Sequence, residues 1–212
     1  MFTKKALTFE HIKEHMTIYV FMVILFLTGI IFGAIIVNSM NFVQKQDLFF
    51  YVDRFFGQII DHRAIAQQEI FKSSLFYHMK YLLLLFILGL SVIGLPVVWI
   101  LLFFKGLVVG FSVGFIVSQL GIKGLLLAAL SIAPQNLIII PIYIVAGSLA
   151  MIFSLTLLSK LFSRRIAQPI LQPLGRYVTV FLLLLATSLV AAGLETFVAN
   201  EAMQAFIKSF YE

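Results

Sequence analysis

Four long apolar stretches, each able to cross a bilayer as a helix, constrain this chain more than any other feature of its sequence. They cover Thr17–Val37, Tyr81–Phe104, Leu137–Leu158 and Tyr177–Val198. The hydrocarbon core of a membrane requires about 20 apolar residues in helical form. A shorter stretch spaced by glycines, Gly106–Leu120, is a fifth candidate. We therefore predict an all-α fold, a polytopic membrane bundle of about five spans.

The composition agrees with a protein whose main solvent is lipid. Of 212 residues, 62% are hydrophobic and 11% are charged, whereas soluble domains carry about 25% charged residues. We expect one integral membrane domain over residues 1–212, with no room for a second soluble domain. The net charge of +6 is spread over several loops, so it does not indicate nucleic-acid binding. The chain has no cysteine, which excludes disulfides and zinc–thiolate sites.

The distribution of charge predicts the orientation in the membrane. Short loops rich in Lys and Arg stay cytoplasmic. The loop 159–176 carries four basic residues and no acid, namely Lys160, Arg164, Arg165 and Arg176. Five spans then place the N-terminus and Lys105 in the cytoplasm. They place residues 38–80, Lys123 and the acidic C-terminal tail outside.

The fourth span is irregular because two prolines interrupt it. Pro134 and Pro141 lie within Gly124–Leu158, which is too long for one straight crossing. Proline removes a backbone donor and clashes with the preceding turn. We expect a break at these prolines, with residues 124–133 as a half-helix or re-entrant arm. The path of residues 105–136 stays open between a full span and a re-entrant one.

A polar pair, Gln135 and Asn136, lies beside the first of these prolines. Backbone groups freed within a membrane must be satisfied by protein or by water in a cavity. The pair therefore serves the backbone opened at Pro134, or it forms a polar site in a broken helix.

Between the first two spans, the outer segment 41–76 is unusually aromatic for a loop. Within it, Asp47–Ile60 has apolar residues at helical spacing. Its aromatic residues are Phe49, Phe50, Tyr51, Phe55 and Phe56. Such rings suit the headgroup boundary, where one side is apolar and the other is wet. The segment is either an interfacial helix that docks a partner or a loop helix packed on its own bundle.

Small residues recur at steps of four in the apolar stretches. Gly29 and Gly33 form one pair, and Gly106, Gly110 and Gly114 form a longer row. Small residues let membrane helices approach closely. The rows predict helix-packing seams, either within one protomer or in a homodimer.

Signals for catalysis are weak. The histidines are His11, His15, His62 and His78. His11 and His15 are four residues apart and could bind a metal together, but the sequence shows no third ligand near them. Phosphate-binding and hydrolase motifs are missing from the sequence. Ionisable residues are expected only at the ends of spans, including Lys105, Lys123 and Glu195. We therefore predict no catalytic residue, no metal and no cofactor.

Three long strings carry a resemblance to a known family. Glu14–Ser39, Gln44–Ile59 and Leu130–Gly147 resemble the first span, the following loop and the proline-interrupted span of the stage II sporulation protein M family. That family commonly carries a Pro-His-Gly motif followed by a Glu in the proline-interrupted span. This chain has Pro134, Gln135 and Asn136, with Ile139 at the aligned Glu position, and this difference fits a scaffold better than a carrier.

The resemblance implies a non-enzymatic scaffold in forespore engulfment. It implies that stage II sporulation proteins P and D, which remodel peptidoglycan, are recruited to the mother-cell side of the septal membrane. The competing hypothesis is a small-solute transporter or channel subunit with its site at Gln135 and Asn136, because broken helices form such sites in carriers.

Overall fold

The structure is a computed structural model and describes residues 13–60, 67–162, 171–199 and 201–205. The described part contains six α-helices, one π-helix and no strand. The elements are α2 (Met16–Ser39), α3 (Phe42–Ile60), α4 (Gln67–Gly89), α5 (Gly94–Ser131), α6 (Ala133–Phe162), α7 (Leu171–Leu194) and η1 (Glu195–Ala199). Five helical segments are long and apolar enough to cross a membrane: α2, α4, α5, α6 and the run from α7 to residue 205. The predicted all-α polytopic bundle is confirmed.

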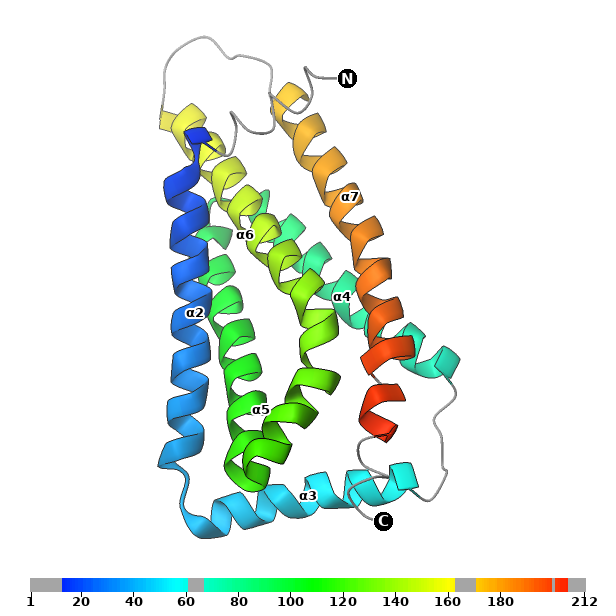
Figure 1. Cartoon of the computed structure of the whole chain (residues 1–212). Coiled ribbons are helices and arrows are strands. Elements are labelled where there is room, and N and C mark those ends of the chain that lie inside the picture. The colour runs from blue at the N-terminus through cyan, green and yellow to red at the C-terminus, as the bar shows by residue number, and fades with distance from the viewer. Residues whose placement is uncertain (1–12, 61–66, 163–170, 200, 206–212) are drawn as a thin grey trace.

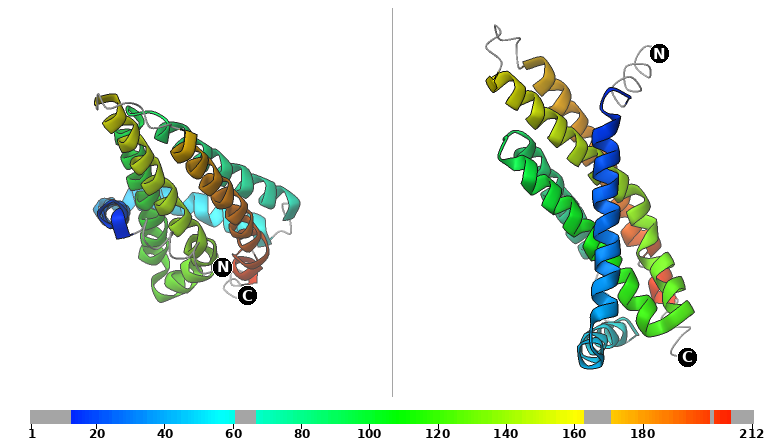
Figure 2. Two further views of the ribbon diagram at one scale, coloured as in Figure 1. Left: turned by 90° about the horizontal axis from the view of Figure 1, so that it is seen from above. Right: turned by 90° about the vertical axis from the view of Figure 1, so that its left-hand side faces the viewer.

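The spanning helices run along the bundle, and α3 lies across one end of it (Figures 1 and 2). The Met16 end of α2 and the Phe162 end of α6 lie at the opposite end (Figure 1). The outer segment therefore has two parts. Residues 42–60 form the transverse helix α3, and residues 67–76 are the first part of the spanning helix α4.

The predicted span Tyr81–Phe104 is wrong, because it combines the end of α4 with the start of α5. A turn over residues 90–93 separates the two helices. The next residue is Gly94, where a Cβ would lie 2.6 Å from the carbonyl carbon of Leu88, so the tight reversal needs glycine. Pro96 sits in the first turn of α5, where its missing N–H costs nothing. Hydropathy could not find this turn because its residues are as apolar as the helices.

Gly106–Leu120 is also not a separate span but part of α5. The span that begins at Gly94 ends at Gly121, whose φ of 57° and ψ of −133° reverse the chain. A short helical arm, residues 122–131, then folds back, and Gly124 lies close to the carbonyl group of Ile116. The predicted half-helix is therefore present, and the full-span path applies to the residues before Gly121.

Helix α6 starts beside the first proline and continues through the second. Pro134 occupies its first turn, and Pro141 lies inside it without ending it, so the predicted break at Pro141 is wrong. The helix bends in its lower half (Figure 1), the half that contains Pro141. At its start, the side-chain amide of Asn136 donates to the carbonyl oxygen of Ile132 at 2.7 Å. Asn136 thus serves the interrupted backbone.

The two glycine rows face each other across the seam between α2 and α5. A Cβ on Gly29 would meet the backbone of Phe103 and Leu107, and one on Gly33 would meet that of Leu107 and Phe111. From the other side, Gly106 lies against Phe26, Gly110 against Ile30 and Gly114, less tightly, against Ala34. The rows are therefore occupied within one protomer, and neither is available for a homodimer.

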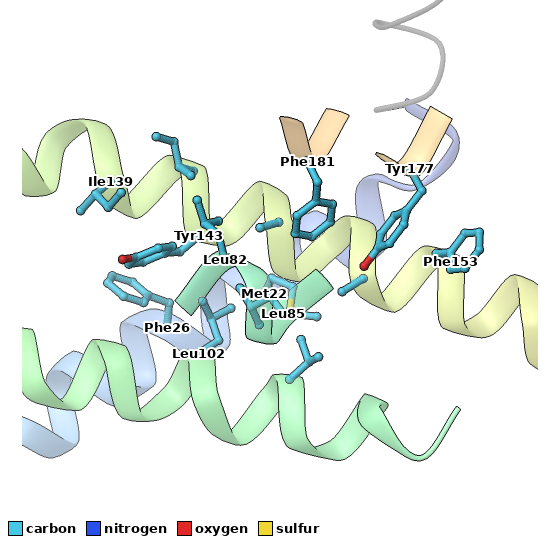
Figure 3. Packing of buried hydrophobic residues seen from close by; sticks show 14 of the residues in the cluster. Met22, Phe26, Leu82, Leu85, Leu102, Ile139, Tyr143, Phe153, Tyr177 and Phe181 are labelled. Atoms are coloured by element: carbon cyan, nitrogen blue, oxygen red, sulfur yellow. The ribbon is translucent and has the colours of Figure 1, made fainter. Parts of the chain in front are cut away.

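Apolar side chains from all five spanning helices form the core (Figure 3). Met22, Leu82, Leu102 and Tyr143 are fully buried near its centre. Small residues on α6, Ala146, Ala150 and Ser154, are also fully buried. Lipid supplies no hydrophobic drive between helices, so this close packing contributes much of the stability.

Candidate functional site

Ionisable side chains from four elements meet inside the bundle. They are His78 of α4, Lys105 of α5, Tyr143 of α6 and Glu195 of η1. The expectation that ionisable groups lie only at the ends of spans is therefore wrong. Lys105 is not in a cytoplasmic loop but in the middle of a spanning helix. We call these four residues the polar cluster.

His78 is the centre of the polar cluster. The residue is 4% exposed, and its Nδ1 lies 2.7 Å from the hydroxyl oxygen of Tyr143, which is fully buried. Its Nε2 lies 3.5 Å from a carboxylate oxygen of Glu195, which is an ion-pair distance and too long for a strong hydrogen bond. The hydroxyl group of Ser74 donates to the same carboxylate oxygen. Glu195 is thus held from one face of α4, because residues four apart lie on the same side of a helix.

Lys105 is surrounded by aromatic rings. Its ammonium group donates to the hydroxyl oxygen of Tyr77 at 3.1 Å. The nitrogen also lies 4.6 Å from the ring centre of Tyr77, 5.1 Å from that of Tyr143 and 5.8 Å from that of Tyr81. Ring faces attract cations within about 6 Å, and more strongly away from water. The three tyrosines therefore stabilise a charge within the bundle.

The polar cluster lies near the middle of the candidate membrane spans. Gly106, the neighbour of Lys105, packs against the carbonyl group of Phe26, which lies near the centre of α2. Because α2 is the most apolar of the helices that are long enough to cross a bilayer, the level of Phe26 marks the middle of that candidate span. Ionisable groups at this depth are costly and usually functional.

The π-helix η1 explains how the last span supplies its carboxylate. α7 ends at Leu194, and Glu195 begins the wider π-turns. Such turns shift the direction of the side chains relative to an α-helix and often occur at functional sites. Sequence reasoning missed the polar cluster because it began the second span at Tyr81 and so left His78 in the loop. The signal was the buried stripe of α4, which repeats at helical spacing through Ser74, His78, Leu82 and Leu85.

The helix α3 is the second candidate site. Its start is a capping box, in which the backbone N–H groups of Asn41 and Gln44 donate to each other's side chains at 3.1 and 2.9 Å. Large apolar side chains are exposed along the helix, namely Phe42 (78%), Val43 (63%), Phe50 (59%) and Tyr51 (67%). Phe49 is half-buried. Phe55 and Phe56 lie on α3, but their side chains are outside the described part.

One side of α3 does contact the bundle. Val52 packs against Leu127 of the arm that follows Gly121. The helix therefore has one side packed on its own bundle and an exposed aromatic side.

Gln135 and Asn136 do not form a group of interacting polar side chains like the polar cluster. Asn136 is engaged with the backbone, as described above. The side-chain oxygen of Gln135 is buried and has no hydrogen-bond partner in the described part of the chain. Among the described residues, no three His, Asp or Glu side chains are grouped to hold a metal; His11 and His62 lie outside these residues.

Five apolar helices around a cluster of ionisable side chains define a multi-pass membrane protein. The sequence model of the stage II sporulation protein M family matches residues 22–200, and the chain belongs to this family. No curated protein and no solved structure matches the chain. The protein is therefore a multi-pass membrane protein of sporulation.

Proposed function

We propose that this protein is a non-enzymatic scaffold that recruits peptidoglycan-remodelling partners to the septal membrane during forespore engulfment. Membership of the stage II sporulation protein M family supports a role in sporulation. Stage II sporulation proteins P and D are the proposed partners, on the mother-cell side of the septum. The proposed orientation has a cytoplasmic N-terminus, with α3 and the C-terminus outside.

The exposed aromatic side of α3 is the observation that carries the proposal. Phe50 and Tyr51 are more than half exposed and lie edge to face, with ring centres 6.3 Å apart. The guanidinium group of Arg54 lies 5.4 Å from the ring centre of Phe50. Aromatic and Arg side chains supply much of the energy of protein interfaces. A transverse helix with this surface is suited to hold a partner at the membrane.

The spanning bundle makes such a helix an effective anchor. The internal motion of the bundle is restricted by backbone-to-backbone packing along the α2–α5 seam and by the buried core. The capping box fixes the start of α3 directly after α2. A partner bound to α3 is thereby confined near the membrane, where confinement raises its effective concentration at the wall.

Transport of a small solute through Gln135 and Asn136 is the alternative. The structure gives it less support, because the amide of Asn136 binds the carbonyl group of Ile132. Only one buried polar atom of this pair, the side-chain oxygen of Gln135, lacks a partner among the described residues. The pair therefore supplies few groups for binding a solute.

Co-purification tests the scaffold function. We expect Phe50→Asp and Tyr51→Asp to release the wall-remodelling partner while the protein accumulates normally in the membrane, because a charge disrupts an apolar contact at little cost to the bundle. Gln46→Asp is the matched control, since Gln46 is exposed on the same helix and the variant introduces the same charge. Full retention of the partner by the aromatic variants would show that α3 is not the docking site.

A further inference from the structure

We propose that His78 is a proton-binding site inside the membrane, that Glu195 connects it to water, and that the bound proton holds η1 against α4. This inference rests on the polar cluster and not on α3 or any partner. It assigns a function to the only described histidine that is buried within a span.

A cavity leads from the polar end of α4 toward the polar cluster. Its volume is about 500 Å³, and it is lined by Glu69, Ile70, Ser73, Ser74, Tyr77 and Glu195. Glu69 and Ser73 are exposed, and five of the six lining side chains carry hydroxyl or carboxyl groups. Such a lining is polar enough to hold water. Water in this cavity can therefore reach the Glu195 side chain, which is 32% exposed.

His78 lies directly behind Glu195 as seen from this cavity. Its side chain is 5% exposed, and its Nε2 is 3.5 Å from the Glu195 carboxylate oxygen. That Nε2 has no hydrogen-bond partner among the described residues, although the other ring nitrogen is engaged with Tyr143. The polar path therefore ends at a buried nitrogen that faces a carboxylate.

Protonation gives this nitrogen its best partner. A neutral imidazole has one donor and one acceptor, whereas the imidazolium donates at both nitrogens. The imidazolium of His78 can donate to Tyr143 and to Glu195 together. An unpaired polar group is costly in an interior and a charged pair is stronger there. Proton binding at His78 thus turns the contact between Nε2 and the Glu195 carboxylate into an ion pair.

The charges around His78 determine what this proton changes. The titratable groups facing it are Tyr77 and Tyr81 from α4, Lys105 from α5, Tyr143 from α6 and Glu195 from η1. Before the proton binds, Lys105 and an ionised Glu195 balance each other. Afterwards the carboxylate is shared between two cations, and η1 is attracted more strongly to α4.

The direction of the pH dependence follows from this arrangement. The ion pair needs His78 charged and Glu195 ionised. It is lost when the imidazole gives up its proton. Histidine changes its charge between about pH 5 and 8 in most settings. We therefore expect η1 to be held firmly near pH 5.5 and less firmly near pH 8.

Distance measurements between two spin labels test the proposal in the full chain. The protein has no native cysteine, so Leu161→Cys and Phe197→Cys, both at exposed positions, can carry the labels. Leu161 is near the end of α6, and Phe197 lies in η1. In nanodiscs, we expect the distance distribution to be narrower near pH 5.5 than near pH 8.

Three variants in this labelled background identify the proton site. His78→Gln should abolish the pH dependence, whereas His15→Gln, at a histidine outside the polar cluster, should preserve it. Glu195→Gln keeps the shape of the side chain and should also abolish the pH dependence. This variant tests the contact between His78 and Glu195 if His78→Gln does not fold. A distribution in the unsubstituted protein that does not change with pH would overturn the proposal. So would a pH dependence that survives in both His78→Gln and Glu195→Gln.

Discussion

Replacing Gly110 by alanine adds one methyl group where the backbones of α2 and α5 meet. A Cβ at this position would lie 2.7 Å from both the carbonyl carbon and the Cα of Ile30. Carbon atoms in contact are about 3.5–4.0 Å apart. Because the opposing atoms belong to the backbone, no change of rotamer makes room. The two helices must separate by roughly 1 Å at this level.

The size of the effect follows from two opposing contributions. Overpacking of a tight contact costs about 1–3 kcal/mol, and a backbone contact that cannot relax belongs at the upper end. Alanine is favoured over glycine in a helix by about 1 kcal/mol, which offsets part of this. We expect Gly110→Ala to lower the free energy of unfolding by about 2 kcal/mol, on the order of a thirtyfold rise in the unfolded-to-folded ratio.

The single tryptophan provides the assay. Trp99 on α5 lies 5.3 Å, centre to centre, from the ring of Phe21 on α2, so its fluorescence reports on this seam. Unfolding is followed by titrating SDS into mixed micelles. Gly193→Ala is the matched control, because a Cβ at Gly193 would meet nothing within 4 Å. Equal midpoints for the two variants would refute the close approach at Gly110.

Three further measurements test other parts of the structure. Gly121→Ala should destabilise the protein by about 1–3 kcal/mol, since φ at this residue is positive; an unchanged SDS midpoint would contradict the reversal there. Val43→Cys should react with an impermeant thiol reagent in intact cells and Leu161→Cys should not, and the opposite labelling would reverse the proposed orientation. Ser154→Ala removes the hydrogen bond, 2.9 Å long, to the carbonyl oxygen of Ser91 in the turn between α4 and α5. Its expected cost is about 0.6 kcal/mol, measured in the same SDS titration.

The glycine rows show how far periodicity can lead without coordinates. Their spacing of four predicted seams, because small residues in register form a groove along one side of a helix. It could not choose between a seam within the protomer and a homodimer, since both use the same groove. The structure makes that choice by placing Gly106 against Phe26 and Gly33 against Leu107.

The helix boundaries show a different limit. The turn between α4 and α5 is apolar, so hydropathy merged parts of two helices into one span. The same error left His78 in a loop and put Lys105 at the end of a helix. Once Gly94 and Gly121 define the ends of the third crossing, Lys105 falls in the middle of it.

The sequence alone determined the class of protein, because apolar stretches of this length have no stable place except a membrane. It also indicated the family and the aromatic character of α3. Only the tertiary structure decided where the ionisable side chains meet. Lys105, Tyr143 and Glu195 are distant from His78 along the chain, and each is an isolated polar residue in an apolar or mixed stretch. Their convergence on His78 depends on the crossing of α4, α5 and α6 and on the π-turns at Glu195, which no local pattern encodes.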